Sequence, residues 1–154
     1  MKQKTKATKP GKFTPGGYAL RIGRSITGVG LFAMEPIEKG KCIVEYTGRR
    51  VSKKEEYESN SKYLFEISKT KTIDGRSKTN KARYINHSCV PNCEIEIRLE
   101  RVYVFSKRKI RAGEELTYDY DTNYFNEYIK PVGCKCIKHA PHLHTKAKTK
   151  VKSR

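Results

Sequence analysis

The segment from Arg83 to Cys93 has the densest group of chemically capable side chains in this sequence. It reads Arg-Tyr-Ile-Asn-His-Ser-Cys-Val-Pro-Asn-Cys and combines amides, an imidazole, thiols and a proline without a regular period. Such polar groups are costly to bury unless they are hydrogen-bonded. The polar groups of this segment must therefore form hydrogen bonds with one another, as in a polar turn around a hydrogen-bonded histidine, or they must bind a ligand.

Two further groups are weaker signals. Gly28-Val29-Gly30 would let the backbone approach a ligand closely or adopt positive φ, although most Gly-x-Gly pairs are only turns. The five cysteines are odd in number and include the pair Cys134-x-Cys136. This pattern argues against a secreted disulfide framework and favours a reducing compartment.

Short strands separated by turns should position these groups. Residues 41–46 and 63–67 are rich in β-forming side chains, and turns are expected at residues 74–75 and 112–114. A short helix should begin at Ser52, because the sequence there has the Ser-x-x-Glu spacing of a capping box.

The clearest strand pattern is the alternation of Ile95, Ile97 and Leu99 with charged residues. It predicts a strand with one buried face, and the apolar run at 102–105 predicts its antiparallel hairpin partner. No long helical crossover is visible, which disfavours a doubly wound parallel sheet. The sequence therefore predicts a mainly β domain.

Positive charge is concentrated at the two ends of the chain. Residues 1–12 hold five lysines and residues 135–154 hold six lysines and one arginine, with no acid in either range, which accounts for +12 of the formal charge of +18. Such runs repel themselves and predict flexible tails. The tails would attract a polyanion such as nucleic acid without sequence specificity, or serve only for solubility.

Five short motifs follow one another along the chain in a specific order. They are Gly28-Val-Gly-Leu-Phe-Ala33, Glu45-Tyr-Thr-Gly48, Tyr63-Leu-Phe65, Asn86-His-Ser-Cys-x-Pro-Asn92 and Gly113-Glu-Glu-Leu-Thr-Tyr-Asp-Tyr120. This ordered set resembles the signature of the SET-domain protein lysine methyltransferases. The resemblance implies a fold of small curved sheets and short helices in which the chain threads a pseudoknot, so that the Asn86 and Tyr120 segments cross beside each other.

The resemblance also implies two ligands that enter from opposite faces and meet in a narrow channel: S-adenosylmethionine and the side chain of a protein lysine. The residues that it assigns to the cofactor are Gly28, Val29, Gly30, Leu31, Tyr63, Arg83, Asn86, His87 and Tyr118. It assigns Tyr120 to catalysis, with a hydroxyl that orients the amine and the methyl group, and it places Tyr46 and Tyr118 in the channel wall.

The chemistry requires a neutral amine, whereas a lysine has a reference pKa of ~10.4. Desolvation in an apolar channel lowers that pKa, and a neighbouring sulfonium acts in the same direction. Aromatic walls can therefore replace a strong general base, and Tyr46, Tyr63, Phe65, Tyr118 and Tyr120 would provide them. By resemblance, tyrosine rather than phenylalanine at position 118 restricts rotation of a methylated amine and implies mainly mono-methylation.

Zinc is also implied, because many relatives join three post-SET cysteines in a Cys-x-Cys-x4-Cys segment to the cysteine of the Asn-His-Ser-Cys motif. The matching residues are Cys89, Cys134 and Cys136. The remaining cysteine would fall at Pro141 and is absent. His142, one residue beyond that spacing, is the preferred fourth ligand and His144 is another candidate, since Cys3His is an ordinary zinc set. His139 is an alternative ligand, and packing without a metal is a further alternative.

These interpretations divide the chain into a basic tail (1–12), a SET domain (13–122), a post-SET-like segment (123–144) and a second basic tail (145–154). Residues 124–132 are expected to cover the lysine channel, with Phe125 and Tyr128 as aromatic lid residues.

The expected substrate is a lysine-containing protein, either a histone or another basic tail. A cationic enzyme repels a free cationic peptide, so we expect a nucleoprotein target, with the tails on phosphate. Glu94, Glu96 and Glu100 are then either an acidic rim for the peptide or a solvated face. A non-catalytic chromatin- or nucleic-acid-binding module and a ribosomal or other non-histone substrate are alternatives.

No apolar stretch is long enough to span a bilayer, and the N-terminus lacks the apolar core of a signal peptide. We therefore expect no membrane association and an intracellular protein. Its location would be nuclear or chromatin-bound in a eukaryote or a host, and cytoplasmic otherwise.

Overall fold

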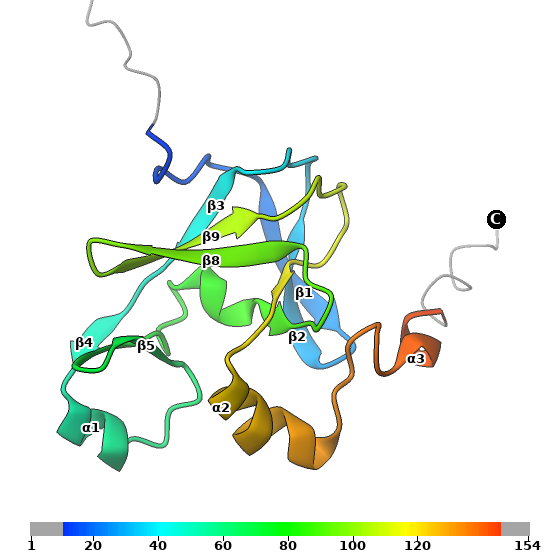
Figure 1. The fold of residues 1–154 in the computed structure, drawn as a ribbon. Coiled ribbons are helices and arrows are strands. Elements are labelled where there is room, and N and C mark those ends of the chain that lie inside the picture. Colours follow the sequence, from blue (N-terminus) through cyan, green and yellow to red (C-terminus); the bar gives the residue numbers. More distant parts are fainter. Residues whose placement is uncertain (1–10, 146–154) are drawn as a thin grey trace, which may run out of the picture.

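The computed structural model describes residues 11–145, which fold into several small sheets rather than one continuous sheet (Figure 1). Strands β1 (Leu20–Ser25) and β2 (Gly28–Ala33) form an antiparallel hairpin. Residues 1–10 and 146–154, which contain most of the two basic tails, lie outside the described residues. Lys12 was assigned to the first tail, but its ammonium is 3.0 Å from the Glu96 carboxylate.

The central sheet has the order β3-β9-β8, with β3 at Cys42–Tyr46, β8 at Cys93–Arg98 and β9 at Arg101–Ser106. Its middle strand is buried from Val102 to Ser106. The predicted hairpin is confirmed, because β8 and β9 pair antiparallel through their full lengths. β-branched and aromatic residues suit such a pleated surface packed on a core.

The end of this hairpin differs from the alternation seen in the sequence. Ile97 is 47% exposed and Leu99 is 82% exposed, so the prediction that both face the core is wrong. Leu99 and Glu100 form the turn with φ of 49° and 62°, an unusual conformation for a bulky side chain. β8 is an edge strand, and the tip of the hairpin has no core to cover.

A second sheet has the order β4-β6-β5, with β4 at Arg49–Val51, β5 at Leu64–Ser68 and β6 at Lys71–Asp74. The short helix α1 (Lys53–Glu58) begins as predicted. The Ser52 hydroxyl accepts from the Glu55 N–H at 3.2 Å, and the Ser52 N–H donates to the Glu55 carboxylate at 2.8 Å.

The prediction of a turn at residues 74–75 is wrong. Asp74 is the last residue of β6, and the chain reverses instead at Lys69-Thr70, between β5 and β6. Aspartate followed by glycine favours a turn locally. Here the side chain of Asp74 is buried and accepts hydrogen bonds from Ser61 and Arg76, which stabilises the strand ending.

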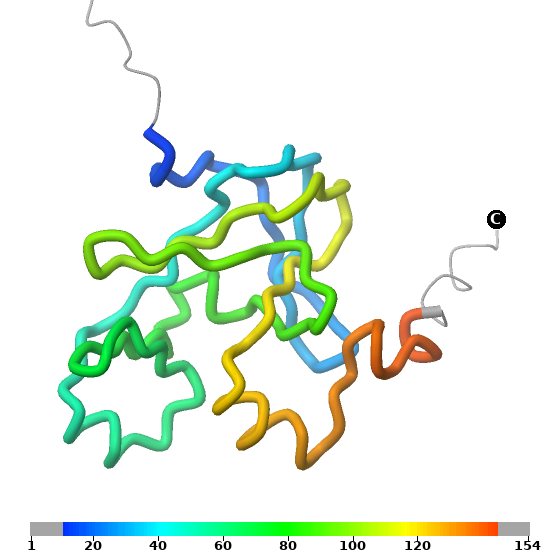
Figure 2. The backbone as a smooth tube through the Cα atoms, in the orientation of Figure 1, coloured from blue at the N-terminus to red at the C-terminus, as the bar shows by residue number. Residues whose placement is uncertain are grey.

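The shortest sheet brings two remote stretches together. After the 3-10 turn η1 (Lys81–Tyr84), strand β7 (Asn86–His87) pairs in parallel with β10 (Thr117–Tyr118). Figure 2 shows the green and yellow segments of the tube side by side at this point. The Asn86 and Tyr120 segments are therefore neighbours, as the expected crossing requires.

The C-terminal part is helical and follows β10 away from the sheets (Figure 1). It contains α2 (Thr122–Tyr124), a π-helical turn η2 (Phe125–Ile129), a 3-10 turn η3 (Lys130–Val132) and α3 (Pro141–Thr145). No helix in the described part of the chain is long and apolar enough to cross a membrane. The mainly β fold with short helices is as predicted.

Candidate active site

A cavity of about 260 Å³ lies between β5, the end of β3 and the segment around α2. Its aromatic walls are Tyr46, Tyr63, Phe65, Tyr118, Tyr120 and Tyr124. Its other lining residues are Lys62, Leu64, Glu66, Arg83, Ile95, Asp119 and Asp121. All five aromatic side chains that the sequence assigned to a channel wall are therefore assembled in one place.

The tyrosine hydroxyls of this wall are anchored to backbone carbonyls. The Tyr46 hydroxyl donates to the Tyr63 carbonyl at 2.7 Å, and the Tyr120 hydroxyl donates to the Ile85 carbonyl. The Tyr118 and Tyr120 ring centroids are 4.6 Å apart. Burial raises the pKa of Tyr46, Tyr118 and Tyr120 far above the ordinary tyrosine value. These hydroxyls stay protonated and can orient a ligand, but they cannot act as general bases.

Tyr124 lies in the segment that was expected to cover the channel, but the sequence analysis did not name it among the aromatic side chains of the cavity. Its ring meets Tyr120 edge to face at 5.1 Å and stacks on Tyr128 at 4.7 Å. The position is fixed by Asp121, whose carboxylate accepts from the Tyr124 N–H at 2.9 Å and caps α2. Of the two expected lid aromatics, Tyr128 packs behind Tyr124 and Phe125 packs on His87 at 5.3 Å. The Asp-x-x-Tyr spacing of a helix N-cap was the available signal.

Next to the cavity, Asn86 ties β7 to the hairpin β1-β2. Its amide donates to the Val29 carbonyl at 2.8 Å and to the Glu115 carboxylate at 2.7 Å. The Ser25 hydroxyl donates to the same carboxylate at 2.8 Å. A Cβ on Gly30 would stand 2.4 Å from Glu115 Oε1, so a larger residue would displace this carboxylate from its present position. Glu115 therefore organises the Asn86 region, although the sequence analysis gave it no role.

The first two residues of β2 are exposed, whereas the next two are buried. Gly28 has φ +117° and no atom within 4 Å of its Cβ position, and Val29 is 49% exposed. Leu31 was also assigned to the cofactor, but its side chain is fully buried in the core and its carbonyl accepts from the Leu116 N–H. Any ligand on this strand would contact Gly28 and Val29, which are exposed, rather than Gly30 or the Leu31 side chain, which are buried.

Arg83 leaves a polar atom unsatisfied at the cavity wall. Its guanidinium lies 4.2 Å from the centroid of the Tyr63 ring, a cation–π arrangement. The Nε atom is buried and has no hydrogen-bond partner among the described residues. Because an unpaired buried donor is costly, this N–H is available to a ligand acceptor.

His87 connects the cavity to the cysteines. Its Nδ1 accepts from the Tyr120 N–H at 3.0 Å, and its Nε2 lies 3.2 Å from the Cys89 sulfur. Burial lowers the pKa of His87, although Asp119 opposes the shift. The neutral ring therefore carries its hydrogen on Nε2, directed toward Cys89. The imidazole was assigned to the cofactor, and both of its nitrogens have contacts within the protein.

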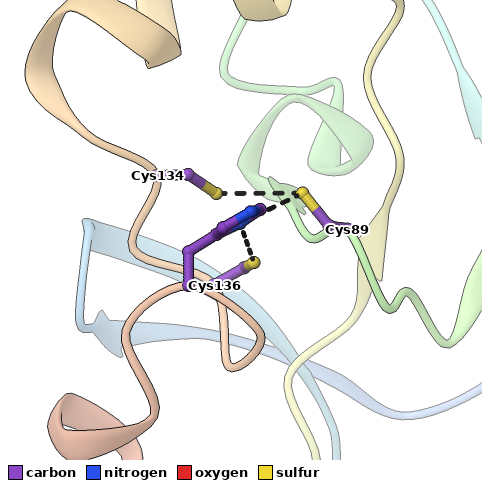
Figure 3. Close-up of side chains that lie close together, drawn as sticks. Cys89, Cys134 and Cys136 are labelled. Atoms are coloured by element: carbon purple, nitrogen blue, oxygen red, sulfur yellow. Dashed lines mark hydrogen bonds between the residues drawn. The ribbon is translucent and has the colours of Figure 1, made fainter.

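The side chains of Cys89, Cys134, Cys136 and His139 converge, with their ligand atoms within 4.8 Å of one another (Figure 3). The Cys89 and Cys134 sulfurs are 4.0 Å apart. His139 Nδ1 is 3.5 Å from the Cys89 sulfur and 3.4 Å from the Cys136 sulfur. Burial opposes ionisation of Cys136, but hydrogen bonds from the Cys89 and His139 backbones lower its pKa to about 6. We call these four residues the Cys3His cluster.

The preference for His142 as the fourth member is corrected by this geometry. The N–H groups of His139 and Ala140 both donate to the Cys136 carbonyl, at 3.1 and 2.8 Å. This tight turn folds His139 back onto Cys136, whereas His142 lies beyond it in α3. The prediction of His142 used only the number of residues that separate it from the cysteines, and that number does not show that the chain turns back after Cys136.

A comparison with protein-family models matches residues 28–121 to the SET domain. This chain belongs to the SET domain family. The match contains the strands that position Asn86, Tyr118 and Tyr120, and it ends before Tyr124 and the last three members of the Cys3His cluster.

Many individual proteins resemble this SET chain. Histone-lysine N-methyltransferase trr of Drosophila melanogaster is 40% identical over 123 residues, which cover 72% of this chain and 5% of that protein. Histone-lysine N-methyltransferase 2D of Homo sapiens is 37% identical over 123 residues, which cover 72% of this chain and 2% of that protein. The H3 lysine-4 specific histone-lysine N-methyltransferase of Schizosaccharomyces pombe is 39% identical over 121 residues, which cover 70% of this chain and 13% of that protein. The chain thus spans only a small part of each of these relatives.

The SET core also places its acids differently from the expected rim. Glu96 contacts Lys12, and Glu100 contacts Lys71, so two of the three suggested rim residues are already paired with cations. The carboxylates that line the cavity are Glu66, Asp119 and Asp121.

Proposed function

We propose that this SET chain is a protein lysine methyltransferase that uses S-adenosylmethionine and acts on a histone or another basic tail. The observation that carries the proposal is the tyrosine-walled cavity, in which the Tyr120 hydroxyl donates to the carbonyl of Ile85, the residue before Asn86. Asn86 in turn contacts β2, where Gly28 is exposed. The names of the relatives, several of them H3 lysine-4 specific, favour the histone H3 tail as the first substrate to test.

The residues beside the cavity fit this cofactor. Gly28 is exposed with no atom near its Cβ position, and the buried Arg83 Nε is a donor that has no partner among the described residues. Glu115 places a negative charge next to Asn86 that would favour a cationic ligand. When bound, S-adenosylmethionine supplies a methyl group on a positively charged sulfur.

The chain's own contribution is to desolvate and orient the amine. The burial that raises the pKa of the wall tyrosines lowers that of a lysine amine in the same cavity, because burial disfavours charge in both. With its hydroxyl donating to Ile85, Tyr120 keeps oxygen lone pairs available to accept from the amine. Holding the reacting atoms in line is worth several powers of ten in rate. The Tyr118 ring lies 4.6 Å from the Tyr120 ring between centroids, and this crowding supports the proposal of mainly mono-methylation.

We also propose that the Cys3His cluster binds zinc. Tetrahedral zinc with bonds of about 2.3 Å to sulfur and about 2.0 Å to nitrogen implies sulfur–sulfur separations near 3.8 Å and sulfur–nitrogen separations near 3.5 Å. The distances of 4.0, 3.5 and 3.4 Å within the cluster fit this donor set. The Cys136 thiol, with its lowered pKa, supplies a thiolate at neutral pH.

The proposed activity can be tested by incubating the protein with a radiolabelled methyl donor and with histone H3, nucleosomes or fractionated lysate. We expect label on histone lysine, and a loss of roughly 100-fold for Tyr120→Phe. Tyr57→Phe is the matched control, because Tyr57 is 93% exposed and absent from the cavity wall. Cofactor binding without transfer to any protein would indicate a binding module instead, and label on a ribosomal protein would change the substrate.

A further inference from the structure

Two segments next to each other carry an unusual density of cations. Residues 37–41 and 106–111 contain Lys39, Lys41, Lys107, Arg108, Lys109 and Arg111, with Glu38 as their only acid. All six cationic residues are exposed. We call this surface the basic edge. It lies within the described fold and is separate from the sequence tails.

The basic edge is held on a rigid frame. Ile37 and Ile110 are both fully buried and exchange two backbone hydrogen bonds, at 2.9 and 2.8 Å. The Gly40 N–H donates to the Ser106 carbonyl at 2.8 Å, and the Ser106 hydroxyl donates to the Glu38 carbonyl at 2.6 Å. The cations therefore project from backbone that is already ordered, so less entropy is lost when they bind.

Most of this charge is not neutralised within the fold. Arg108 contacts Glu114 at 2.9 Å and Lys109 contacts Glu38 at 3.5 Å. Lys39, Lys41, Lys107 and Arg111 make no ion pair with a carboxylate in residues 11–145. Four free cations on one ordered edge produce a positive field that attracts a polyanion.

The position of the basic edge also separates it from the cavity. In Figure 1 its segments are the cyan loop leading into β3 and the yellow-green loop after β9, at the top of the molecule. The elements beside the cavity, β5 and α2, lie at the bottom, and the cavity lining includes Glu66, Asp119 and Asp121. A polyanion on the edge would leave the cavity free for a protein substrate.

We propose that the basic edge binds the phosphate backbone of duplex DNA. Phosphate contacts need cations at a surface and no base-specific groups. An anionic membrane fits less well, because basic membrane surfaces usually add exposed apolar side chains. Among the described residues, none of the exposed large hydrophobic side chains lies in the two segments. This surface goes beyond methyl transfer and can be tested without it.

The test compares two full-length variants with the same change in net charge. The edge variant carries Lys39→Glu, Lys41→Glu, Lys107→Glu and Arg111→Glu. The control variant carries Lys54→Glu, Lys69→Glu, Lys78→Glu and Lys81→Glu, which are exposed and outside the edge. Binding to a labelled duplex of about 20 base pairs is measured by fluorescence anisotropy over a range of salt concentrations.

We expect the edge variant to bind at least about tenfold more weakly, with a slope of log K against log salt reduced by about 2 to 4, while the control loses much less. Equal losses in both variants would show that only net charge matters and would overturn the proposal. Lysine acetylation with mass spectrometry gives a second readout, in which DNA should protect Lys39, Lys41 and Lys107 in the wild type. Absence of that protection, or stronger binding to anionic vesicles than to DNA, would also overturn it.

Discussion

The tyrosine-walled cavity and the Cys3His cluster both depend on the segment around Asn86, yet they are stabilised in different ways. The wall tyrosines donate to the Tyr63 and Ile85 carbonyls, so this region is satisfied by the protein itself. The cluster instead brings three thiols and an imidazole together, with the partly exposed Cys134 and the exposed His139 among them. Preformed hydrogen bonds hold the first site together without a metal, whereas the proposed zinc would hold the donors of the second together.

His87 is the connection between these two regions. It accepts from the Tyr120 N–H on one side and contacts the Cys89 sulfur on the other. A change in the cluster can therefore reach the tyrosine wall through a single side chain. The comparison predicts that damage to the cluster lowers activity while the sheets remain folded.

Loss of the cluster should produce the largest effect. We expect Cys134→Ser to lose most bound zinc and roughly 10- to 100-fold in methyl transfer, because a thiolate ligand and the cluster's hold on Cys89 are removed. Metal analysis and a transfer assay would measure this, with far-UV circular dichroism as the check on the sheets. Cys42→Ser is the control, since Cys42 is a free cysteine outside the cluster. Full zinc content in Cys134→Ser would contradict the assignment.

The choice of histidine can be tested in the same way. His139→Ala should weaken zinc binding by roughly tenfold or more, because the structure places His139 Nδ1 between two cluster sulfurs. His142→Ala should bind zinc nearly as well as the wild type. Competition with a chelator of known affinity gives the zinc affinities of both variants. Weaker zinc binding by His142→Ala than by His139→Ala would restore the preference for His142.

Breaking the polar support of Asn86 should have an intermediate effect. Glu115→Gln removes a charge that accepts from Asn86 and Ser25, and hydrogen bonds to charged groups contribute roughly 1.5–3 kcal/mol. We expect affinity for S-adenosylmethionine to fall by about tenfold, with little change in the KM of the peptide. Calorimetric titration measures the affinity. Glu94→Gln, an exposed acid outside the site, should change neither value.

A smaller change should alter the product rather than the rate. Tyr118→Phe removes one hydroxyl from the wall while the ring beside Tyr120 remains. We expect a higher share of di- and trimethyl-lysine, read by mass spectrometry of the product peptide. Tyr57→Phe should leave the product pattern unchanged, and an unaltered pattern in Tyr118→Phe would count against the role of this hydroxyl.

The smallest effect on either site should come from helix α1, which contacts the cavity lining through the 3.5 Å pair between the side chains of Lys53 and Glu66. Ser52→Ala removes the N-cap of α1 and should lower the free energy of unfolding by about 1 kcal/mol. Denaturant titration measures this loss. Zinc content and methyl transfer should stay at wild-type values, and a large loss of activity would show that α1 supports the cavity more directly than its contacts indicate.

Local signals in the sequence were sufficient for much of the fold. The capping box at Ser52 and the β8-β9 hairpin depend on neighbours in the chain, so short-range physics decides them. The turn at residues 74–75 was wrong because buried hydrogen bonds to Asp74 outweigh a local preference. The prediction that Ile97 faces the core was wrong, because an alternating pattern of apolar and charged residues cannot show where the core ends.

The sequence by itself determined which residues are chemically capable. The resemblance of its ordered motifs to the SET family grouped Asn86, His87, Tyr118 and Tyr120, and the odd number of cysteines argued against a disulfide framework. Only the tertiary structure decided which of them meet. Glu115 and Tyr124 joined the site, Leu31 went into the core, and His139 replaced His142. The physical reason is that side-chain contacts depend on how turns and sheet pairings fold remote segments together, and residue spacing along the chain does not contain that information.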